Sequence, residues 1–300
     1  MREYFFANYR LLMDDRIANH ESSKKRLADF AAPMPYTHTF TLRLGDAKEL
    51  EERRERALNC PVAYDADIYT IHDIDGGRAF VSTLKYEHPR MGGLRNVILC
   101  SQDYGDMTVW VTDRFFEIER NGQEPFIPRL IPIFATFEAG IVMRDGLPIH
   151  ASLVEKDGFG VVFLGPCGRG KSTQAKLWEK YLGADFLIGD RPVLRKLGGK
   201  WLGFGMPWDG PDMLYRQISV PVRALVYLEK AKENSISPMN TVQAMPKLLQ
   251  QARMPVWDDT AVDGAVALMG ELAWEVPVYR LQCLPDEAAA RLTYETIYKR

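Results

Sequence analysis

Residues 161–173 read Val-Val-Phe-Leu-Gly-Pro-Cys-Gly-Arg-Gly-Lys-Ser-Thr, an apolar run that leads directly into closely spaced glycines and a lysine. Gly165, Gly170, Lys171 and Ser172 match the pattern G-x-x-x-x-G-K-[ST] of a phosphate-binding loop. Glycines let the backbone turn tightly near a triphosphate, and their N–H groups then form an anion-binding nest. Lys171 would reach the β- and γ-phosphates, and the Ser172 hydroxyl would ligate Mg²⁺. The expected nucleotide contacts are Gly165, Pro166, Cys167, Gly168, Arg169, Gly170, Lys171, Ser172 and Thr173.

The segments on both sides of this loop have the required character. Residues 160–164 are apolar and rich in β-branched side chains, which indicates a buried strand. Residues 173–182 consist of good helix formers with an apolar face at Ala175, Leu177, Trp178 and Leu182, and Gly183 would end the helix. A strand, a loop and a helix in this order place the phosphates at a helix N-terminus.

The bulk composition excludes several classes of protein. The chain has 300 residues, 46% of them hydrophobic, and a formal net charge of −2. Such a balance gives no electrostatic footprint for nucleic acid or for an anionic membrane. The charged first fifteen residues are unlike a signal peptide. Cys60, Cys100, Cys167 and Cys283 are widely spaced, which favours reduced thiols and a cytoplasmic protein over a zinc site or a disulfide framework.

Hydrophobic patterns predict an α/β (α+β) fold in two domains, a β-rich domain over residues 1–122 and a nucleotide-binding domain over residues 123–300. Residues 1–30 are expected to be a helical, charged lead-in. Alternating segments with hairpin turns at residues 75–77 and 103–106 follow, and residues 46–58 could be helical. A helix over residues 128–143 precedes the second domain, in which strands alternate with helices over residues 241–252, 259–274 and 285–299.

Three further features are candidates for the site around the loop. Asp190 follows the apolar residues 186–188, where a nucleotide enzyme holds Mg²⁺ or deprotonates an acceptor, although it could simply form a turn before Pro192. His150 could contact the γ-phosphate or the acceptor, or be an ordinary core histidine. The loop over residues 205–212, with Trp208, could line an acceptor pocket or be a surface turn.

These residues resemble the kinase domain of HPr kinase/phosphorylase and, more distantly, phosphoenolpyruvate carboxykinase. His150, the glycine-rich loop and Asp190 correspond to the histidine, the loop and the acidic signature of those families. The chain is still more similar to HPr-kinase-like proteins of peptide-modification clusters. The resemblance covers roughly residues 125–300 and implies a P-loop kinase core. The paired aspartates of these families correspond here to Gly189-Asp190, so if Asp190 is the metal ligand, the catalytic base is missing.

The sequence therefore predicts Mg²⁺-dependent transfer of a phosphoryl group from ATP, or another nucleoside triphosphate, to a hydroxyl, for which the resemblance suggests a serine of a peptide or protein. Lys171 would stabilise the phosphates, Ser172 and Asp190 would hold the metal, Asp190 would be the candidate base, and Arg191 or His150 would neutralise the transferring group. The alternatives are a nucleotide-binding accessory protein that transfers no phosphate, and a small-molecule kinase or carboxykinase-like enzyme. Neither nucleic acid nor a membrane is an expected partner, and a homo-oligomer is compatible with the sequence.

Overall fold

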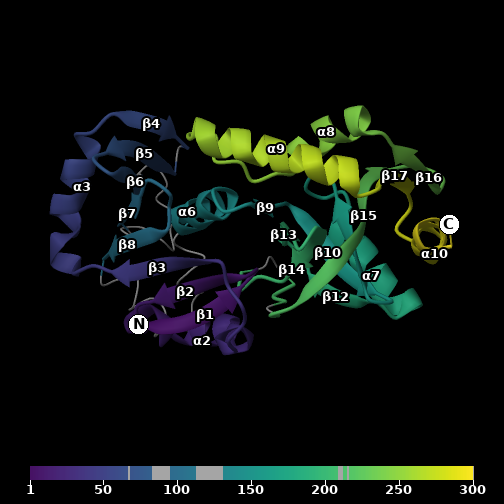
Figure 1. Ribbon diagram of the computed structural model, residues 1–300, viewed down its shortest axis with the longest axis horizontal. Helices are drawn as coiled ribbons and strands as arrows, with labels where there is room; N and C mark the ends of the chain where they lie inside the picture. The colour runs from purple at the N-terminus through teal and green to yellow at the C-terminus, as the bar shows by residue number, and fades with distance from the viewer. Residues whose placement is uncertain (67, 83–94, 113–130, 209–211, 215, 300) are drawn as a thin grey trace. The chain divides into compact units, whose positions relative to one another are not determined.

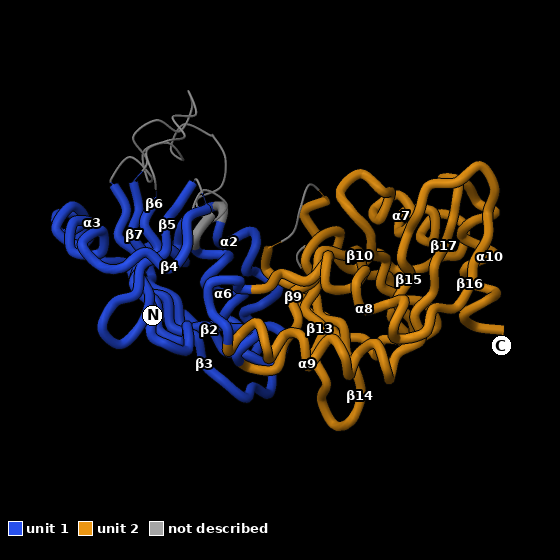
Figure 2. Tube along the Cα trace, turned by 90° about the horizontal axis from the view of Figure 1, so that it is seen from above, with its two compact units in different colours: residues 1–143, 255–259 blue, residues 144–254, 260–300 orange. Residues whose placement is uncertain are grey.

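The computed structural model describes residues 1–66, 68–82, 95–112, 131–208, 212–214 and 216–299. The chain divides into two compact units (Figure 2), unit 1 with residues 1–143 and 255–259 and unit 2 with residues 144–254 and 260–300. Among the described residues, unit 1 is built on an eight-stranded sheet and unit 2 on a nine-stranded sheet. The predicted mixed α/β class with a β-rich N-terminal part is confirmed. The expected boundary between residues 122 and 123 lies outside the described residues.

The sheet of unit 1 has the strand order β1-β2-β3-β8-β7-β6-β5-β4 (Figure 1). The strands are β1 (Arg2–Phe6), β2 (Tyr9–Met13), β3 (His38–Leu44), β4 (Val62–Asp65), β5 (Tyr69–Ile74), β6 (Gly77–Ser82), β7 (Asn96–Ser101) and β8 (Asp106–Val111). The helical elements are α1 (Asp15–Ala18), α2 (Glu21–Leu27), η1 (Ala28–Ala31), η2 (Ala47–Glu49), α3 (Leu50–Leu58) and α6 (Ile131–Val142). The two predicted hairpins are confirmed as the antiparallel pairs β5–β6 and β7–β8.

The prediction of a helical lead-in over residues 1–30 is wrong for its first part. β1 and β2 form an antiparallel hairpin instead, in which Phe6 pairs with Tyr9. Ala7 and Asn8 make the turn with φ angles of 48° and 61°. Tyr9, Leu11 and Met13 are buried at alternate positions of β2, which is the period of a strand rather than of a helix. Helices α1 and α2 begin only after this hairpin.

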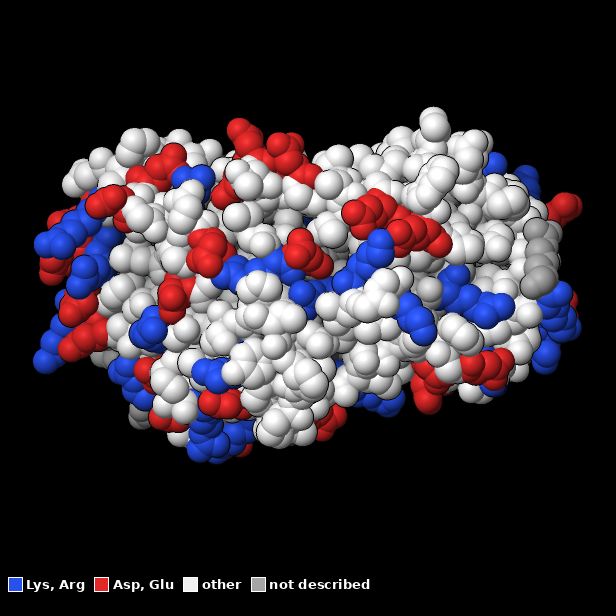
Figure 3. All heavy atoms as spheres, viewed as in Figure 1, with Lys and Arg blue, Asp and Glu red and all other residues white. Residues whose placement is uncertain are grey.

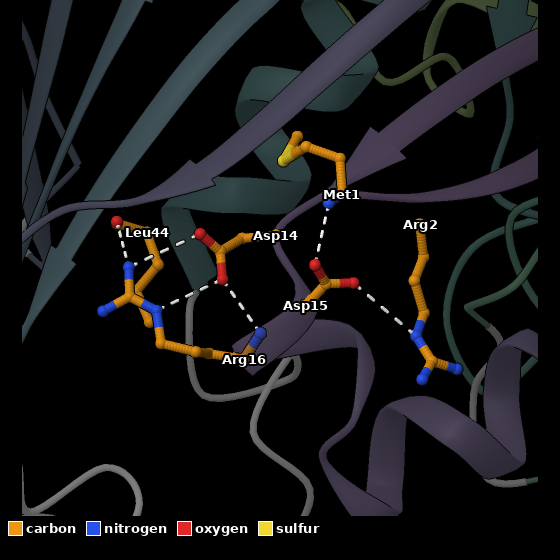
Figure 4. Close-up of polar contacts among 6 residues, drawn as sticks. All are labelled: Met1, Arg2, Asp14, Asp15, Arg16 and Leu44. Carbon is orange, nitrogen blue, oxygen red and sulfur yellow. Dashed lines mark hydrogen bonds and ion pairs between the residues drawn. The ribbon is translucent and has the colours of Figure 1, made fainter.

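Polar contacts fix the point at which β2 passes into α1 (Figure 4). Asp14 caps α1 by accepting a hydrogen bond from the Arg16 backbone N–H, and the Arg16 guanidinium also donates to the Leu44 carbonyl at the end of β3. Burial raises the pKa of the Asp14 carboxyl, but the bonds from Arg16 outweigh burial and leave this pKa below its usual value. Asp15 pairs with the Met1 amine and with Arg2. These contacts tie the start of α1 to β1 and β3.

Residues 255–259 return to unit 1 from within the sequence of unit 2 and are held there by a buried polar cluster. The Tyr104 hydroxyl donates to Asp258 over 2.8 Å and accepts from the Trp257 indole N–H over 3.2 Å. Arg78 lies 3.8 Å from the same Asp258 carboxylate. Burial and the neighbouring carboxylate raise the pKa of Tyr104 far above its usual value, so this hydroxyl keeps its proton and remains a donor.

The sheet of unit 2 carries the phosphate-binding loop. Its strands are β9 (Gly146–Pro148), β10 (Ala151–Lys156), β11 (Phe159–Leu164), β12 (Asp185–Ile188), β13 (Val193–Leu197), β14 (Lys200–Phe204), β15 (Ser219–Lys230), β16 (Ser235–Met239) and β17 (Val278–Cys283). Its helices are α7 (Lys171–Leu182), α8 (Thr241–Leu249), α9 (Asp259–Glu275) and α10 (Glu287–Tyr298). β16, which includes Pro238, is a strand that the sequence analysis did not anticipate.

The long strand β15 joins two parts of this sheet. Its first residues pair antiparallel with β14, and its remainder pairs parallel with β11 and with β17. Because β11, β15 and β17 are parallel, their carboxyl ends at Leu164, Lys230 and Cys283 lie at one edge. Ligands of open α/β sheets bind at such an edge.

Helix α7 is anchored on the sheet by its apolar face, as the sequence predicts. Ala175 and Trp178 are fully buried, while Leu177 and Leu182 are partly buried against the same cluster. The Trp178 ring packs edge-on against Phe163 of β11 and against Tyr294 of α10, at centroid distances of 5.6 and 6.0 Å. Gly183 ends α7 in the left-handed conformation with a φ of 63°. The helix that begins at the loop is therefore packed against both the sheet and α10.

Three further observations concern the cysteines, the surface charge and the apolar character of the helices. All four cysteines are free thiols. On the face drawn in Figure 3, basic and acidic side chains are interspersed among the described residues without a broad area of one sign. Within the described part of the chain, no helix combines the length and the apolar character needed to cross a membrane. The first residues of the predicted helix over 128–143 lie outside the described residues, and α6 covers the rest except Met143.

Candidate active site

The loop between β11 and α7 has the conformation that its glycines allow. Gly165, Gly168 and Gly170 have φ angles of 148°, 73° and 96°, a region that side chains other than that of glycine rarely adopt. Lys171 is the first residue of α7, with Gly170 as its N-cap. The backbone N–H groups of the first turn have no partner inside a helix, so they are available to an anion at this position.

Lys171 is held inside this loop rather than extended into solvent. The residue is 8% exposed, and its Nζ donates a hydrogen bond of 2.9 Å to the Gly165 carbonyl. Burial lowers the pKa of the Lys171 amine, and the Asp190 carboxylate opposes this effect. A buried cation beside a glycine-rich turn gains most from an anionic ligand, because its lost hydration is then replaced by a direct interaction.

The structure brings several of the predicted residues together around one cavity of about 390 Å³, whereas Gly165, Pro166, Arg169 and Arg191 are not among its lining residues. Lys171, Ser172, Asp190 and His150 all contribute to its wall, although they come from three separate segments of the chain. The cavity lining is His150, Cys167, Gly168, Gly170, Lys171, Ser172, Thr173, Gly189 and Asp190. We call this space the phosphate cavity.

Asp190 lies between two cationic or potentially cationic groups. Its Oδ1 is 3.8 Å from the His150 Nε2, and its Oδ2 is 3.4 Å from the Arg191 Nε. Arg191 has a φ of 59°, a strained backbone conformation for a long side chain. Such strain is retained mainly where the surrounding structure requires it, and functional sites are common examples. The turn over residues 189–191 therefore holds the carboxylate and the guanidinium side by side.

His150 is placed by the strand region that precedes the loop. Its backbone N–H donates to the Gln251 carbonyl over 2.8 Å, next to the bridge between Ile149 and Ala252. Burial lowers the pKa of the His150 imidazole, the positive charge of Lys171 lowers it further, and Asp190 acts in the opposite direction. Arg253 adds to the lowering. The imidazole is therefore neutral near pH 7 in the absence of an anion.

Sequence reasoning missed two parts of this region. Arg253 belongs to the segment that pairs with residues 148–150, where its N–H donates to the Pro148 carbonyl, and no local motif marks it. A second cavity of about 410 Å³ adjoins the loop at Gly168 and Gly170, and its wall is formed at the carboxyl ends of β15 and β17. Its other lining residues are Arg169, Thr173, Gln174, Lys230, Ala231, Cys283, Leu284 and Pro285. This cavity depends on the parallel pairing of strands that lie far apart in the sequence, so no local pattern predicts it.

For the loop over residues 205–212, the sequence left open whether it lines an acceptor pocket or forms a surface turn. Met206 and Trp208 are buried, and neither lines the phosphate cavity. Residues 209–211 lie outside the described residues. Trp208 thus belongs to the packing of unit 2 in the described structure.

The residues of the phosphate cavity are suited to a magnesium ion whose other ligands are phosphate oxygens. Ser172 and Asp190 supply a hydroxyl and a carboxylate, the oxygen ligands that Mg²⁺ prefers. The described residues contain no group of three or more His, Cys, Asp or Glu side chains arranged for a metal ion. Mg²⁺ is commonly bound by one or two protein oxygens, with phosphates and water completing its shell. The site therefore suits a metal that arrives with a nucleotide.

Comparison with known proteins gives little direct guidance. No protein-family model matches the chain, and no curated protein matches it. Among solved structures, the chain is similar to the Hpr(Ser) kinase/phosphatase from Coxiella burnetii, with 15% sequence identity and a TM-score of 0.29. The match covers 50% of this chain and 87% of the other. This is a weak likeness, so the function proposed below rests on the residues of the site.

Proposed function

We propose that this protein is a magnesium-dependent phosphotransferase that moves the γ-phosphoryl group of a nucleoside triphosphate to a hydroxyl. The observation that carries the proposal is the buried Lys171, hydrogen-bonded to Gly165 in a glycine-rich turn at the start of α7, with Asp190 and His150 on the same cavity wall. Buried cations and oriented N–H groups bind triphosphate, and a carboxylate beside them suits a metal or a proton acceptor.

Each residue has a role that follows from its position. Lys171 and the N–H groups of the loop stabilise the charge of the β- and γ-phosphates. Ser172 and Asp190 would hold Mg²⁺, which would neutralise phosphate charge when bound. His150 and Arg191 face the carboxylate of Asp190 and supply positive charge or hydrogen-bond donors to the group in transfer. The second cavity, at the carboxyl ends of β15 and β17, offers room for the nucleoside.

The acceptor class comes from the sequence resemblance rather than from the geometry. We propose a serine of a peptide or protein. An accessory protein that binds a nucleotide without transferring phosphate, and a kinase of small molecules, are the other outcomes of the test below.

The test is a phosphate-transfer assay with γ-labelled Mg·ATP against serine-containing peptides, proteins and small hydroxyl compounds. Wild type should label one class of acceptor. Asp190→Asn should lose at least ~10²-fold in transfer rate, with a higher Mg²⁺ requirement if the carboxylate is a metal ligand. Asp185→Asn is the matched control, because Asp185 is an exposed acid of β12 outside the cavity wall, and it should stay within about twofold. Binding of Mg·ATP without transfer to any acceptor would favour the accessory protein.

A further inference from the structure

Gly189 lines the phosphate cavity, and its backbone conformation does not require a glycine. Its φ lies outside the left-handed region that favours glycine. The reason is instead the side chain of Asp212. A Cβ built on Gly189 would lie 2.4 Å from the Asp212 Oδ2 and 3.0 Å from its Cβ. The space that a side chain at position 189 would occupy is therefore filled by a carboxylate from a distant part of the chain.

Asp212 is held in this position from the other side by helix α7. Its Oδ1 pairs with the Lys176 Nζ over 2.7 Å. Lys176 follows Ser172 by four residues, so the two side chains share one face of α7. The Asp212 side chain is only 14% exposed, compared with 59% for Lys176. Asp212 is thus a largely buried carboxylate beside both the Gly189–Asp190 turn and the helix face that carries Ser172.

Transfer to a hydroxyl benefits from a carboxylate that takes the hydroxyl proton as the new bond forms. Asp190 is poorly suited to accept this proton, because its two oxygens already face His150 and Arg191. It would also hold the metal. Asp212 has one oxygen on Lys176, while the other lies against Gly189. A second carboxylate, which no local motif marks, thus lies directly against Gly189, a residue of the cavity wall.

We propose that Asp212 is the general base of the phosphotransfer, an inference that rests on the proposed function. The oxygen of the acceptor hydroxyl forms a bond to the γ-phosphorus, and the bond from this phosphorus to the β,γ-bridging oxygen breaks. The nucleoside diphosphate leaves with that electron pair. The hydroxyl proton passes to the carboxylate of Asp212 and from there to water. Lys176 is a positioning residue that holds Asp212 against Gly189.

The experiment measures release or transfer of phosphate from γ-labelled Mg·ATP, with water and a pool of serine-containing peptides as acceptors, together with Mg·ATP affinity by calorimetry. Asp212→Asn should keep the affinity within about threefold and lose at least ~10²-fold in kcat. Lys176→Met removes the ion pair but leaves the carboxylate, and it should lose less than about tenfold. Thermal melts of each variant verify that it is folded.

Moving the carboxylate from position 212 to position 189 distinguishes a catalytic role of this group from a structural one. Asp212→Gly opens the space beside residue 189, so that Gly189→Asp can be combined with it without the close contact that the single change would create. The double variant should recover at least ~10-fold of the rate lost in Asp212→Gly, whereas Gly189→Asn with Asp212→Gly should recover none.

The outcomes distinguish this inference from the proposed function. Three results would overturn the base assignment and leave the proposed phosphotransferase activity intact. They are an unchanged transfer rate in Asp212→Asn, equal losses of kcat in Asp212→Asn and Lys176→Met, and equal recovery of the rate by the two double variants. If wild type binds Mg·ATP but gives phosphate to neither acceptor, transfer and the base assignment both fail. If wild type binds no Mg·ATP, the proposed function itself is wrong.

Discussion

The charged side chains of the phosphate cavity are largely shielded from water. Lys171 is almost fully buried, and His150 and Asp190 have side-chain exposures of 31% and 25%. Ionised groups in such surroundings lose hydration and depend on their neighbours for compensation. A triphosphate would supply this compensation to Lys171 and to a protonated His150. At this scale, the partial burial of these groups is consistent with the proposed binding of a triphosphate.

His150 provides a prediction about pH. Its pKa in the folded protein lies below its usual value of 6.5, so the unfolded chain binds the proton more readily. The free energy of unfolding should therefore fall as the pH is lowered through 6.5 toward the folded pKa. His150→Gln should weaken this dependence, and His38→Gln, which changes an exposed histidine of β3, should not.

The same residue should respond to nucleotide. A nearby triphosphate favours the protonated imidazole, so Mg·ATP should raise the pKa of His150, which an NMR titration of the imidazole signals would measure. A His150 pKa at or above the usual value without nucleotide, or no change on adding Mg·ATP, would contradict the described placement of His150 in the phosphate cavity.

At the scale of elements, local signals in the sequence predicted local structure well. The loop, the strand before it and the helix up to Gly183 are encoded by neighbouring residues, and each is confirmed. The hairpin of β1 and β2 was missed because Tyr4, Phe5 and Phe6 are buried in succession and the apolar Leu12 takes a less buried position of β2, so the sequence does not alternate clearly. The placement of His150 and Asp190 in one cavity depends on strand pairing, and Asp212 reaches Gly189 from a distant loop. Spacing along the chain cannot reveal either contact.

The start of α10 offers a prediction about stability. The sequence places a helix start at residues 285–287, and Asp286 is the N-cap. Its Oδ1 accepts hydrogen bonds from the Ala289 N–H and from the Asn234 amide, both at 2.9 Å. Asp286→Ala should cost about 1–2 kcal/mol of unfolding free energy, because a helix cap and a long-range bond are lost together.

Asp286→Asn is the control for this change, because its amide oxygen can still accept both bonds. Urea denaturation of the two variants measures the difference. Equal stabilities would mean that the cap contributes little and that α10 is held mainly by the packing of Tyr294 and Tyr298 on Trp178.

At the scale of the whole molecule, the residues that line the phosphate cavity all belong to unit 2. A fragment of residues 144–300 should therefore bind Mg·ATP within several-fold of the full chain, as measured by calorimetry. The Tyr104 and Arg78 partners of residues 257 and 258 are absent from it, so this short segment should become exposed to protease. A fragment that unfolds cooperatively yet binds no Mg·ATP would show that unit 1 helps to build the site.

The central claim is that the buried Lys171 and the loop around it bind the phosphates of a nucleotide. Calorimetric titration of the full chain with Mg·ATP tests it most directly, with wild type compared to Lys171→Met and to Lys180→Met, an exposed lysine of the same helix. A hydrogen bond to a charged group contributes about 1.5–3 kcal/mol, so Lys171→Met should weaken binding by roughly 10- to 150-fold, while Lys180→Met stays within about twofold. Equal affinities of all three proteins for Mg·ATP, or no binding by wild type, would contradict the account.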